Sequence, residues 1–326
     1  MPWDVRFKAG VHLPQIGWWL DAQRAQPRAF VSHAHSDHIA PHREVLATRA
    51  TASLMRLRLG GKRQETILDY GQPWPAEFGC ELRLHPAGHI FGSAMLQATT
   101  DHGSLLYTGD FKLRPGLAAE PCVAPRADVL IMETTFGLPR YVFPPPAEVE
   151  RGIVDFCRQA LADGVTPVLL AYSLGKTQEL LQIVGGAGLP VMLHAQGHKL
   201  TRRYAELGMK LPPYRLLDTN DYAGQVVIAP PQPGHDAPLS WIHPRRTAVA
   251  TGWAMDPGAI YRHGCDAAFP LSDHADFPDL LAFVGQVQPK LVYTLHGFAR
   301  EFAATLRARG IEAWALGQNN QLELTM

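Results

Sequence analysis

The chain lacks several features that would place it in a specialised class of protein. Its 326 residues carry 30 basic and 30 acidic side chains, so no global positive charge attracts nucleic acid. No apolar run approaches the roughly 20 residues of a membrane helix, and the first residues do not resemble a secretion signal. The four cysteines form no Cys-x-x-Cys pair, which indicates reduced thiols. We therefore expect a cytoplasmic protein without membrane contact.

The pattern of apolar and polar residues predicts an α/β protein with an inserted segment. In the first part, several short strands are each followed by an ionisable or polar residue, which places those groups on one rim of a sheet. After the three prolines at 144–146, helices and strands alternate, as in a parallel sheet. The ionisable pattern returns after residue 269. The predicted helices are 50–59, 147–162, 176–185 and 199–208, and the predicted strands of the insertion are 167–172, 189–193, 225–229 and 247–251.

The strongest chemical signal is a metal-binding cluster of the form His-x-His-x-Asp-His. His33, His35, Asp37 and His38 stand in the loop 32–41, directly after the predicted buried strand 28–31. Neutral imidazoles suit zinc, iron or manganese. A single tetrahedral zinc needs only three or four ligands, so the cluster is better explained by two adjacent ions. With 15 histidines in the chain, a chance occurrence has a probability of about 2 in a thousand.

Three further residues are candidates for closing two metal sites. His89, Asp110 and His296 each follow a predicted strand beside a glycine. Alone, each is more often a turn or cap residue, but beside the cluster they complete a ligand set. Two ions can share a hydroxide of lowered pKa and hold both oxygens of a displacement, which predicts hydrolysis of a phosphodiester or acyl bond. The predicted ligands are His33, His35 and His89 for one ion, Asp37, His38 and His296 for the other, and Asp110 between them.

The order of these residues resembles that of the metallo-β-lactamase superfamily, and the second half narrows the resemblance to its β-CASP nucleases. The resemblance implies an αββα sandwich formed by residues 1–140 and 263–326. It also implies an α/β cap domain at 141–262. Within the family, the chain is most similar to the bacterial ligase-associated DNA exonucleases.

The same resemblance assigns roles to four residues. Glu133, His274 and His296 match family motifs A, B and C, and Asp21 matches the aspartate that orients a metal ligand. A carboxylate beside an imidazole raises the imidazole pKa, so Glu133 would prepare His274 to protonate a departing oxygen. The alternative is that Glu133 merely caps the following turn. The predicted catalytic residues are Asp37, His274 and Glu133.

Contacts with a nucleic-acid strand are predicted from a helix start and from basic residues. Gly175-Lys176-Thr177 imitates the end of a P-loop, but the first glycine of that motif would fall on Leu170. The N-terminus of a helix can still bind a phosphate group. Each basic side chain also fits a solvated surface charge, and together they form a local patch. The predicted contacts are Ser173, Lys176, Thr177, Lys112, Arg114, Arg202 and Arg203.

These features predict a nuclease that uses two divalent ions, zinc or manganese. We expect a 5′-to-3′ DNA exonuclease that acts on strand ends before a partner DNA ligase in bacterial repair, with a metal-bridging hydroxide as nucleophile. An RNase of the same fold is the first alternative, because His296 is typical of the RNA-processing branch. A small-molecule hydrolase is the second, although a small substrate needs no insertion of this length. The third alternative is a scaffold protein without catalysis, and the predicted set of metal ligands argues against it.

Overall fold

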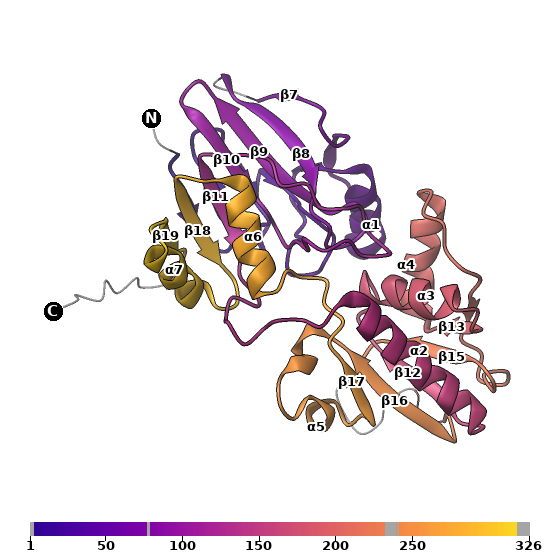
Figure 1. Cartoon of the computed structure of the whole chain (residues 1–326). Helices are drawn as coiled ribbons and strands as arrows, with labels where there is room; N and C mark the ends of the chain where they lie inside the picture. The colour runs from indigo at the N-terminus through magenta and orange to yellow at the C-terminus, as the bar shows by residue number, and fades with distance from the viewer. Residues whose placement is uncertain (1–2, 77–78, 232–238, 240, 318–326) are drawn as a thin grey trace. The chain divides into compact units, whose positions relative to one another are not determined.

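The computed structural model describes residues 3–76, 79–231, 239 and 241–317, and the chain divides into two compact units (Figure 1). The first unit comprises Met1–Pro115, Ala119–Val142 and His274–Met326, and the second comprises Gly116–Ala118 and Phe143–Asp273. The predicted roles of residues 1–140 and 263–326 as a catalytic domain, and of 141–262 as a cap, stay predictions.

The described residues of the first unit form two β-sheets. One has the strand order β1-β2-β3-β4-β5-β6 and the other β19-β18-β11-β10-β9-β8-β7. The strands of the first sheet are β1 (Arg6–Phe7), β2 (Val11–Leu13), β3 (Trp18–Leu20), β4 (Arg28–Phe30), β5 (Glu44–Ala47) and β6 (Gln64–Ile67). Those of the second are β7 (Trp74–Pro75), β8 (Glu81–Pro86), β9 (Ala94–Thr100), β10 (Gly103–Tyr107), β11 (Val129–Glu133), β18 (Leu291–Leu295) and β19 (Glu312–Ala315).

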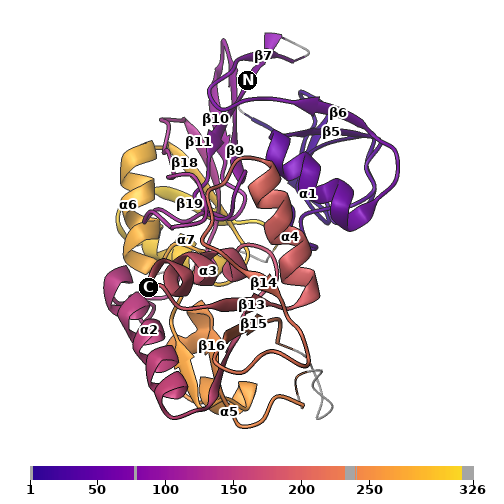
Figure 2. The same cartoon turned by 90° about the vertical axis from the view of Figure 1, so that its right-hand side faces the viewer.

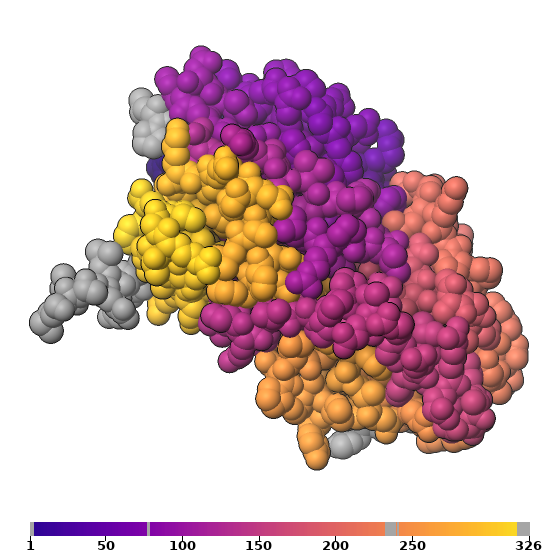
Figure 3. All heavy atoms as spheres, viewed as in Figure 1, coloured from indigo at the N-terminus to yellow at the C-terminus, as the bar shows by residue number. Residues whose placement is uncertain are grey.

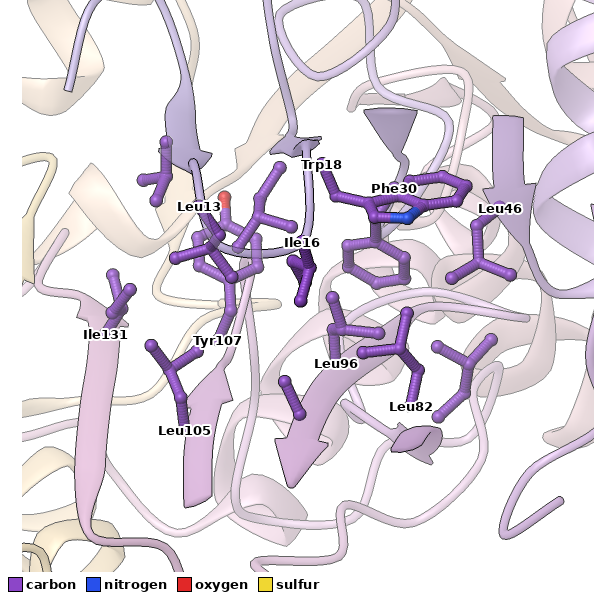
Figure 4. Close-up of a cluster of buried hydrophobic side chains, with 14 of the residues drawn as sticks. Leu13, Ile16, Trp18, Phe30, Leu46, Leu82, Leu96, Leu105, Tyr107 and Ile131 are labelled. Carbon is purple, nitrogen blue, oxygen red and sulfur yellow. The ribbon is translucent and has the colours of Figure 1, made fainter. Parts of the chain in front are cut away.

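The two sheets pack face to face through a core of large apolar side chains (Figure 4). Trp18 of the first sheet meets Trp74 of the second edge to face, with ring centroids 5.8 Å apart. Phe30 and Tyr107 pair in the same way at 6.3 Å. Full burial of such a side chain stabilises the fold by roughly 1.5–3 kcal/mol. This core therefore fixes the ends of β3, β4 and β10, from which the candidate site is built.

In the described part of the first unit, the α-helices are α1 (Arg49–Leu59), α6 (Phe277–Val287) and α7 (Ala299–Ala308). Phe283 of α6 and Phe302 of α7 belong to the core cluster that also contains Leu106 and Val292 of the second sheet. Residues of these two helices form much of the orange and yellow surface of this unit (Figure 3). Helices packed on a sheet sandwich confirm the predicted α/β class and agree with the fold that the resemblance implies.

Among the described residues, the second unit contains one fully parallel sheet of order β14-β13-β15-β12-β16-β17. Figure 2 shows β13, β14, β15 and β16 of this sheet. Apolar residues of α2 and α3 belong to the same core as the sheet residues Leu169 and Ile228. The predicted alternation of helix and strand is confirmed. The elements are α2 (Pro146–Ala162), β12 (Thr166–Leu170), α3 (Lys176–Gly186), β13 (Val191–Leu193), α4 (Ala195–Glu206), β14 (Arg215–Leu216), β15 (Val226–Ala229), β16 (Arg245–Ala250), the 3-10 helix η2 (Gly252–Met255), α5 (Ala259–His263) and β17 (Ala267–Phe269).

Membrane insertion through a helix finds no support in the part of the chain that the structure describes, because no helix there is both long and apolar enough to span a bilayer.

Candidate metal centre

The candidate ligands lie where strands of the first unit end. Leu20 of β3 is paired in parallel with Phe30 of β4, so Asp21 and the histidine loop leave the first sheet at the same edge. In the second sheet, β10, β11 and β18 are also parallel. Asp110, Glu133 and His296 therefore gather at one edge of that sheet. Strand direction, set by sheet pairing, brings together residues that are far apart in the sequence.

Three imidazoles and one carboxylate converge on a single point. His33 Nε2 lies 3.0 Å from His35 Nδ1, and His89 Nε2 lies 3.1 Å from the same atom. The Asp110 Oδ2 atom is 3.6 Å from His33 Nε2 and 3.8 Å from His89 Nε2. The ligand atoms of these four residues all lie within 4.8 Å of one another. The structure thus brings the predicted first ligand group together.

The spacing of this group fits zinc. A zinc–nitrogen bond is about 2.0–2.1 Å long, so two nitrogens on one tetrahedral ion lie about 3.3 Å apart. The observed nitrogen pairs come close to that value. Burial, followed by the neighbouring imidazoles of His38, His89 and His35, lowers the pKa of His33 well below its usual range. The His33 ring is therefore neutral at physiological pH, which is the form that binds a metal.

The second predicted ligand group is more open. His38 is buried, whereas the Asp37 side chain is 68% exposed and its Oδ2 atom lies 3.7 Å from His38 Nε2. The rings of His38 and His296 have their centroids 5.9 Å apart. All three residues line one small cavity of about 30 Å³, beside Asp21 and Tyr107. The residues are close, but they do not converge on a point as the first group does.

Asp110 lies between the two groups. Its Oδ2 atom is 3.3 Å from His38 Nε2, in addition to its contacts with His33 and His89. Burial opposes ionisation of Asp110, but His38 outweighs it and holds the carboxyl pKa well below its usual range. In turn burial opposes protonation of His38, and the carboxylates of Asp110 and Asp21 raise the His38 pKa well above its usual value. Asp110 is thus an ionised group in contact with both candidate sites.

Asp21 orients His38 and is itself held by two residues that the sequence did not single out. Asp21 Oδ2 lies 2.9 Å from His38 Nδ1, which leaves Nε2 to face the site. The same oxygen accepts hydrogen bonds from Ser32 Oγ at 2.5 Å and from Tyr107 Oη at 2.9 Å, and Oδ1 accepts from the Ser32 amide. A tyrosine that ends a core strand gave no signal in the sequence, because core packing alone would explain it.

Two residues of this site have strained backbone conformations. Asp21 has φ +46° and His296 has φ +60°, both in the left-handed region that non-glycine residues rarely adopt. Such conformations cost of order 1–3 kcal/mol and cluster at functional sites. Before Asp110, Gly109 has φ +56°, and a Cβ there would lie 2.5 Å from Ser32 Cβ. The turn that presents Asp110 therefore requires glycine.

Glu133 and His274 form the predicted pair. His274 Nδ1 lies 2.8 Å from Glu133 Oε1, which also accepts the Phe111 amide at 3.1 Å. Glu133 Oε2 accepts bonds from the Thr135 amide at 3.0 Å and from Thr135 Oγ1 at 2.5 Å. Glu133 thus both caps the following turn and binds the histidine. The His274 ring stands 4.7 Å from that of His89, centroid to centroid, beside the first ligand group.

The residues predicted to contact a nucleic-acid strand differ in how far they are buried. Lys176 is buried, donates to the Leu271 carbonyl at 2.7 Å and pairs with Asp273 at 3.0 Å; Thr177 is also buried. Arg114 pairs with Asp276 and Asp279 at 2.5 and 2.9 Å. The bonds of Lys176 and Arg114 and the burial of Thr177 do not favour a role in binding a nucleic-acid strand for these three residues. At or near the surface lie Ser173, Lys112, Arg202 and Arg203, the last two beside Glu206.

Comparison with known proteins gives relatives along the whole chain. Residues 267–316, which contain His274 and His296, match the model of the Zn-dependent metallo-hydrolase RNA specificity domain. A probable DNA ligase of Opitutus terrae is 60% identical over 325 residues, covering 99% of this chain and 32% of that protein. An RNase J-like protein of Methanocaldococcus jannaschii is 27% identical over 49% of this chain and 44% of its own length.

The chain is also similar to a third relative and to one solved structure. The 5′ exonuclease Apollo of Gallus gallus is 27% identical over 80% of this chain and 56% of its own length. A protein of unknown function from Enterococcus faecalis V583 has a similar fold, with a TM-score of 0.61 and 13% identity over 90% of this chain and 80% of that one. The chain spans about a third to a little over half of the three relatives' lengths.

The family match, the nuclease names among the relatives and the His/Asp cluster together support a metal-dependent nuclease. They agree with the order of motifs in the sequence and with the sheet sandwich that carries them. These findings point to the metallo-β-lactamase superfamily and, within it, to the β-CASP family.

Proposed function

We propose that the chain is a two-metal DNA exonuclease that removes nucleotides from strand ends, in the 5′-to-3′ direction, before ligation in the cytoplasm. The similarity to a probable DNA ligase over 99% of this chain supports a link between end processing and ligation. The 27% identity with the 5′ exonuclease Apollo supports the polarity. The substrate, the polarity and the partner ligase are parts of this proposal.

The observation that carries the proposal is the position of Asp110. One carboxylate oxygen lies 3.3–3.8 Å from the Nε2 atoms of His33, His38 and His89, so a single group touches both ligand sets. His33, His35 and His89 would hold one ion, and Asp37, His38 and His296 the other. When bound, two divalent ions activate water and neutralise the charge of a phosphodiester in displacement.

The residues of the chain prepare this site in two ways. Asp21 accepts from His38 Nδ1 and so directs Nε2 of that ring toward Asp110. Glu133 accepts from His274 Nδ1, and His274 Nε2 would carry a proton toward the scissile bond. The departing sugar oxygen would take that proton as the phosphorus–oxygen bond breaks. Glu133 is buried and fixed by three other bonds, so it holds the imidazole in one orientation.

The test is a time course on end-labelled single-stranded DNA and matched RNA, with the label at either end and zinc or manganese present. The control is protein with Asp37→Ala and His38→Ala together. The proposal predicts stepwise loss of nucleotides from the 5′ end of DNA by the native protein and no loss by the variant. Loss from the 3′ end would overturn the polarity, and equal cleavage by the variant would overturn the site.

RNA cleavage is the second candidate. The matched domain, residues 267–316, is named for RNA specificity, and it contains His296. The RNase J-like relative also supports this alternative. The same time course separates the two candidates, because preferential cleavage of the RNA strand, or internal cuts in it, would replace the DNA proposal.

A further inference from the structure

The loop that carries His89 is held by hydrogen bonds at nearly every step. It leaves β8 at Pro86 and enters β9 at Ala94, and the Ala87 amide donates to the Ser93 carbonyl at 3.0 Å. Ser93 Oγ accepts from the amides of His89 and Ile90, each at 3.2 Å. The direction of the His89 ring therefore depends on where the peptide groups of residues 90–93 lie.

The Gly92 residue is the anchor of this loop. Its amide donates to Glu120 Oε2 at 2.9 Å. Its carbonyl accepts from Thr48 Oγ1 at 2.7 Å and from Thr51 Oγ1 at 2.9 Å. Gly92 has φ +79°, and a Cβ there would lie 2.4 Å from Ala50 Cβ. Three side chains thus fix one residue, and only glycine fits between them.

Glu120 stands out among these partners. It is a partly buried carboxylate, and burial raises its pKa. Within the described residues, no cationic side chain lies within ion-pair distance of it; its hydrogen bonds come from the Gly92 amide and its own. A desolvated carboxylate without a cation costs free energy unless it is well hydrogen-bonded. The contact that Glu120 makes is with the loop that carries a metal ligand.

We propose that Glu120 is a positioning residue for the first metal site: it fixes the Gly92 amide and thereby the direction of His89. Partners that orient metal ligands change metal affinity by about 10–100-fold when they are removed. Glu120 acts one step further from the ion, so we expect a loss of about tenfold. We expect the lower metal affinity at the site of His33, His35 and His89. The affinity at the site of Asp37, His38 and His296 should not change.

The test compares Glu120→Ala, Glu120→Gln and a control, Glu81→Ala. Glu81 lies on β8, the strand that leads to the His89 loop, and pairs with Arg83 rather than with the loop. Zinc affinity is measured by competition with a chelating dye, and the geometry of the site by the absorption spectrum of the cobalt-loaded protein. Glu120→Ala should lose about tenfold in affinity for the tighter ion and change the spectrum. Glu120→Gln keeps an acceptor oxygen and should restore both, and Glu81→Ala should match the native protein.

Wild-type affinity and spectrum in folded Glu120→Ala would overturn the inference, even if its melting temperature fell, because a merely structural role lowers stability alone. An equal loss in Glu120→Gln would also contradict it. If Glu120→Ala does not fold, Thr51→Val removes one donor to the Gly92 carbonyl, and unchanged zinc affinity there would count against the inference. The inference rests on the proposed metal site but not on nuclease activity. Failure of the native protein to bind zinc would overturn the site itself, whereas unchanged affinity in the variants would overturn only the role of Glu120.

Discussion

The two ligand groups differ in how completely the protein forms them. The group of His33, His35 and His89 has its nitrogens 3.0–3.1 Å apart, and His33 and His89 are buried. In the other group, Asp37 is 68% exposed and the rings of His38 and His296 are 5.9 Å apart. A preformed site loses little conformational entropy when an ion binds, whereas exposed ligands must first be ordered. We infer that the first group binds its ion more tightly.

The two groups also differ in how firmly their ligands are held and in how easily a substrate can reach them. The buried group is backed by the His89 loop and by the ends of β4 and β8, so its ligands have little freedom to move. The open group includes an exposed aspartate and an exposed histidine, where a phosphate oxygen can approach. If each group holds an ion, the ion of the open group is the one that the substrate can reach. The ranking of affinities that we infer therefore follows from burial.

The largest effect is expected from Asp110→Asn, because Asp110 contacts both groups. Loss of its negative charge weakens both ions and should reduce nuclease activity on the order of 10³-fold. The measurements are initial rates on end-labelled DNA and metal content after dialysis. Retention of two ions and near-native rates would contradict the position assigned to Asp110 between the sites.

His35→Ala and His296→Ala separate the two groups. His35→Ala removes a ligand from the preformed site, so we expect loss of the tighter ion. His296→Ala should leave that ion in place and remove only the weaker one. Cleavage should fall about 100-fold or more in both variants, since both ions act on the phosphodiester. Metal analysis of the dialysed proteins distinguishes them, and loss of the tighter ion from His296→Ala would reverse the ranking.

The pH dependence of zinc binding should differ between the groups. Burial and neighbouring imidazoles lower the pKa of His33, so its ring holds no proton at about pH 6.5 and above. Burial opposes protonation of His38, but Asp110 and Asp21 raise its pKa, so zinc must displace a proton there above that pH as well. Affinity for the weaker ion should therefore rise up to about tenfold per pH unit, until the pH passes the raised pKa of His38.

His33 contributes no such slope to the affinity for the tighter ion over the same range above pH 6.5. Zinc titrations at about pH 6.5, 7 and 8 check both slopes. Equal slopes for the two ions would show that the proton on His38 does not distinguish the groups.

Tyr107→Phe should have the smallest effect, and on one group only. It removes the hydrogen bond from Tyr107 Oη to Asp21 Oδ2 but keeps the ring in the core. Asp21 then orients His38 less firmly, and the affinity for the weaker ion should fall about tenfold. Titration of the variant with zinc checks this, and an equal loss at both sites would indicate a general change in the fold.

Much of the fold followed from the sequence because local signals agree with the tertiary structure. The predicted helices 50–59 and 147–162 correspond to α1 and α2 within one residue at each end. The predicted helix 199–208 begins earlier, at Ala195, with His194 accepting the Gln196 amide as its cap. Histidine is not a usual capping residue, and Gly197 weakens the helical pattern. Weak local signals at that end are overridden by packing.

The candidate ligands could be proposed from the sequence, because four of them stand in one short loop. Their proximity to His89, Asp110, Glu133 and His274 depends on strand direction and sheet pairing, which the sequence does not contain in local form. Tyr107, Ser32 and Glu120 act through hydrogen bonds formed only in the folded chain. Lys176 was predicted to contact a phosphate from the start of a helix, yet it is buried and pairs with Asp273. Pairing of that kind leaves no local pattern.

The most direct test adds zinc stepwise to the metal-free protein while the cleavage of end-labelled DNA is followed. Two unequal sites joined by Asp110 predict that the first equivalent binds at least about tenfold more tightly and produces little cleavage, whereas the second equivalent starts it. Full cleavage with one equivalent, or two equivalents of equal affinity, would contradict the account.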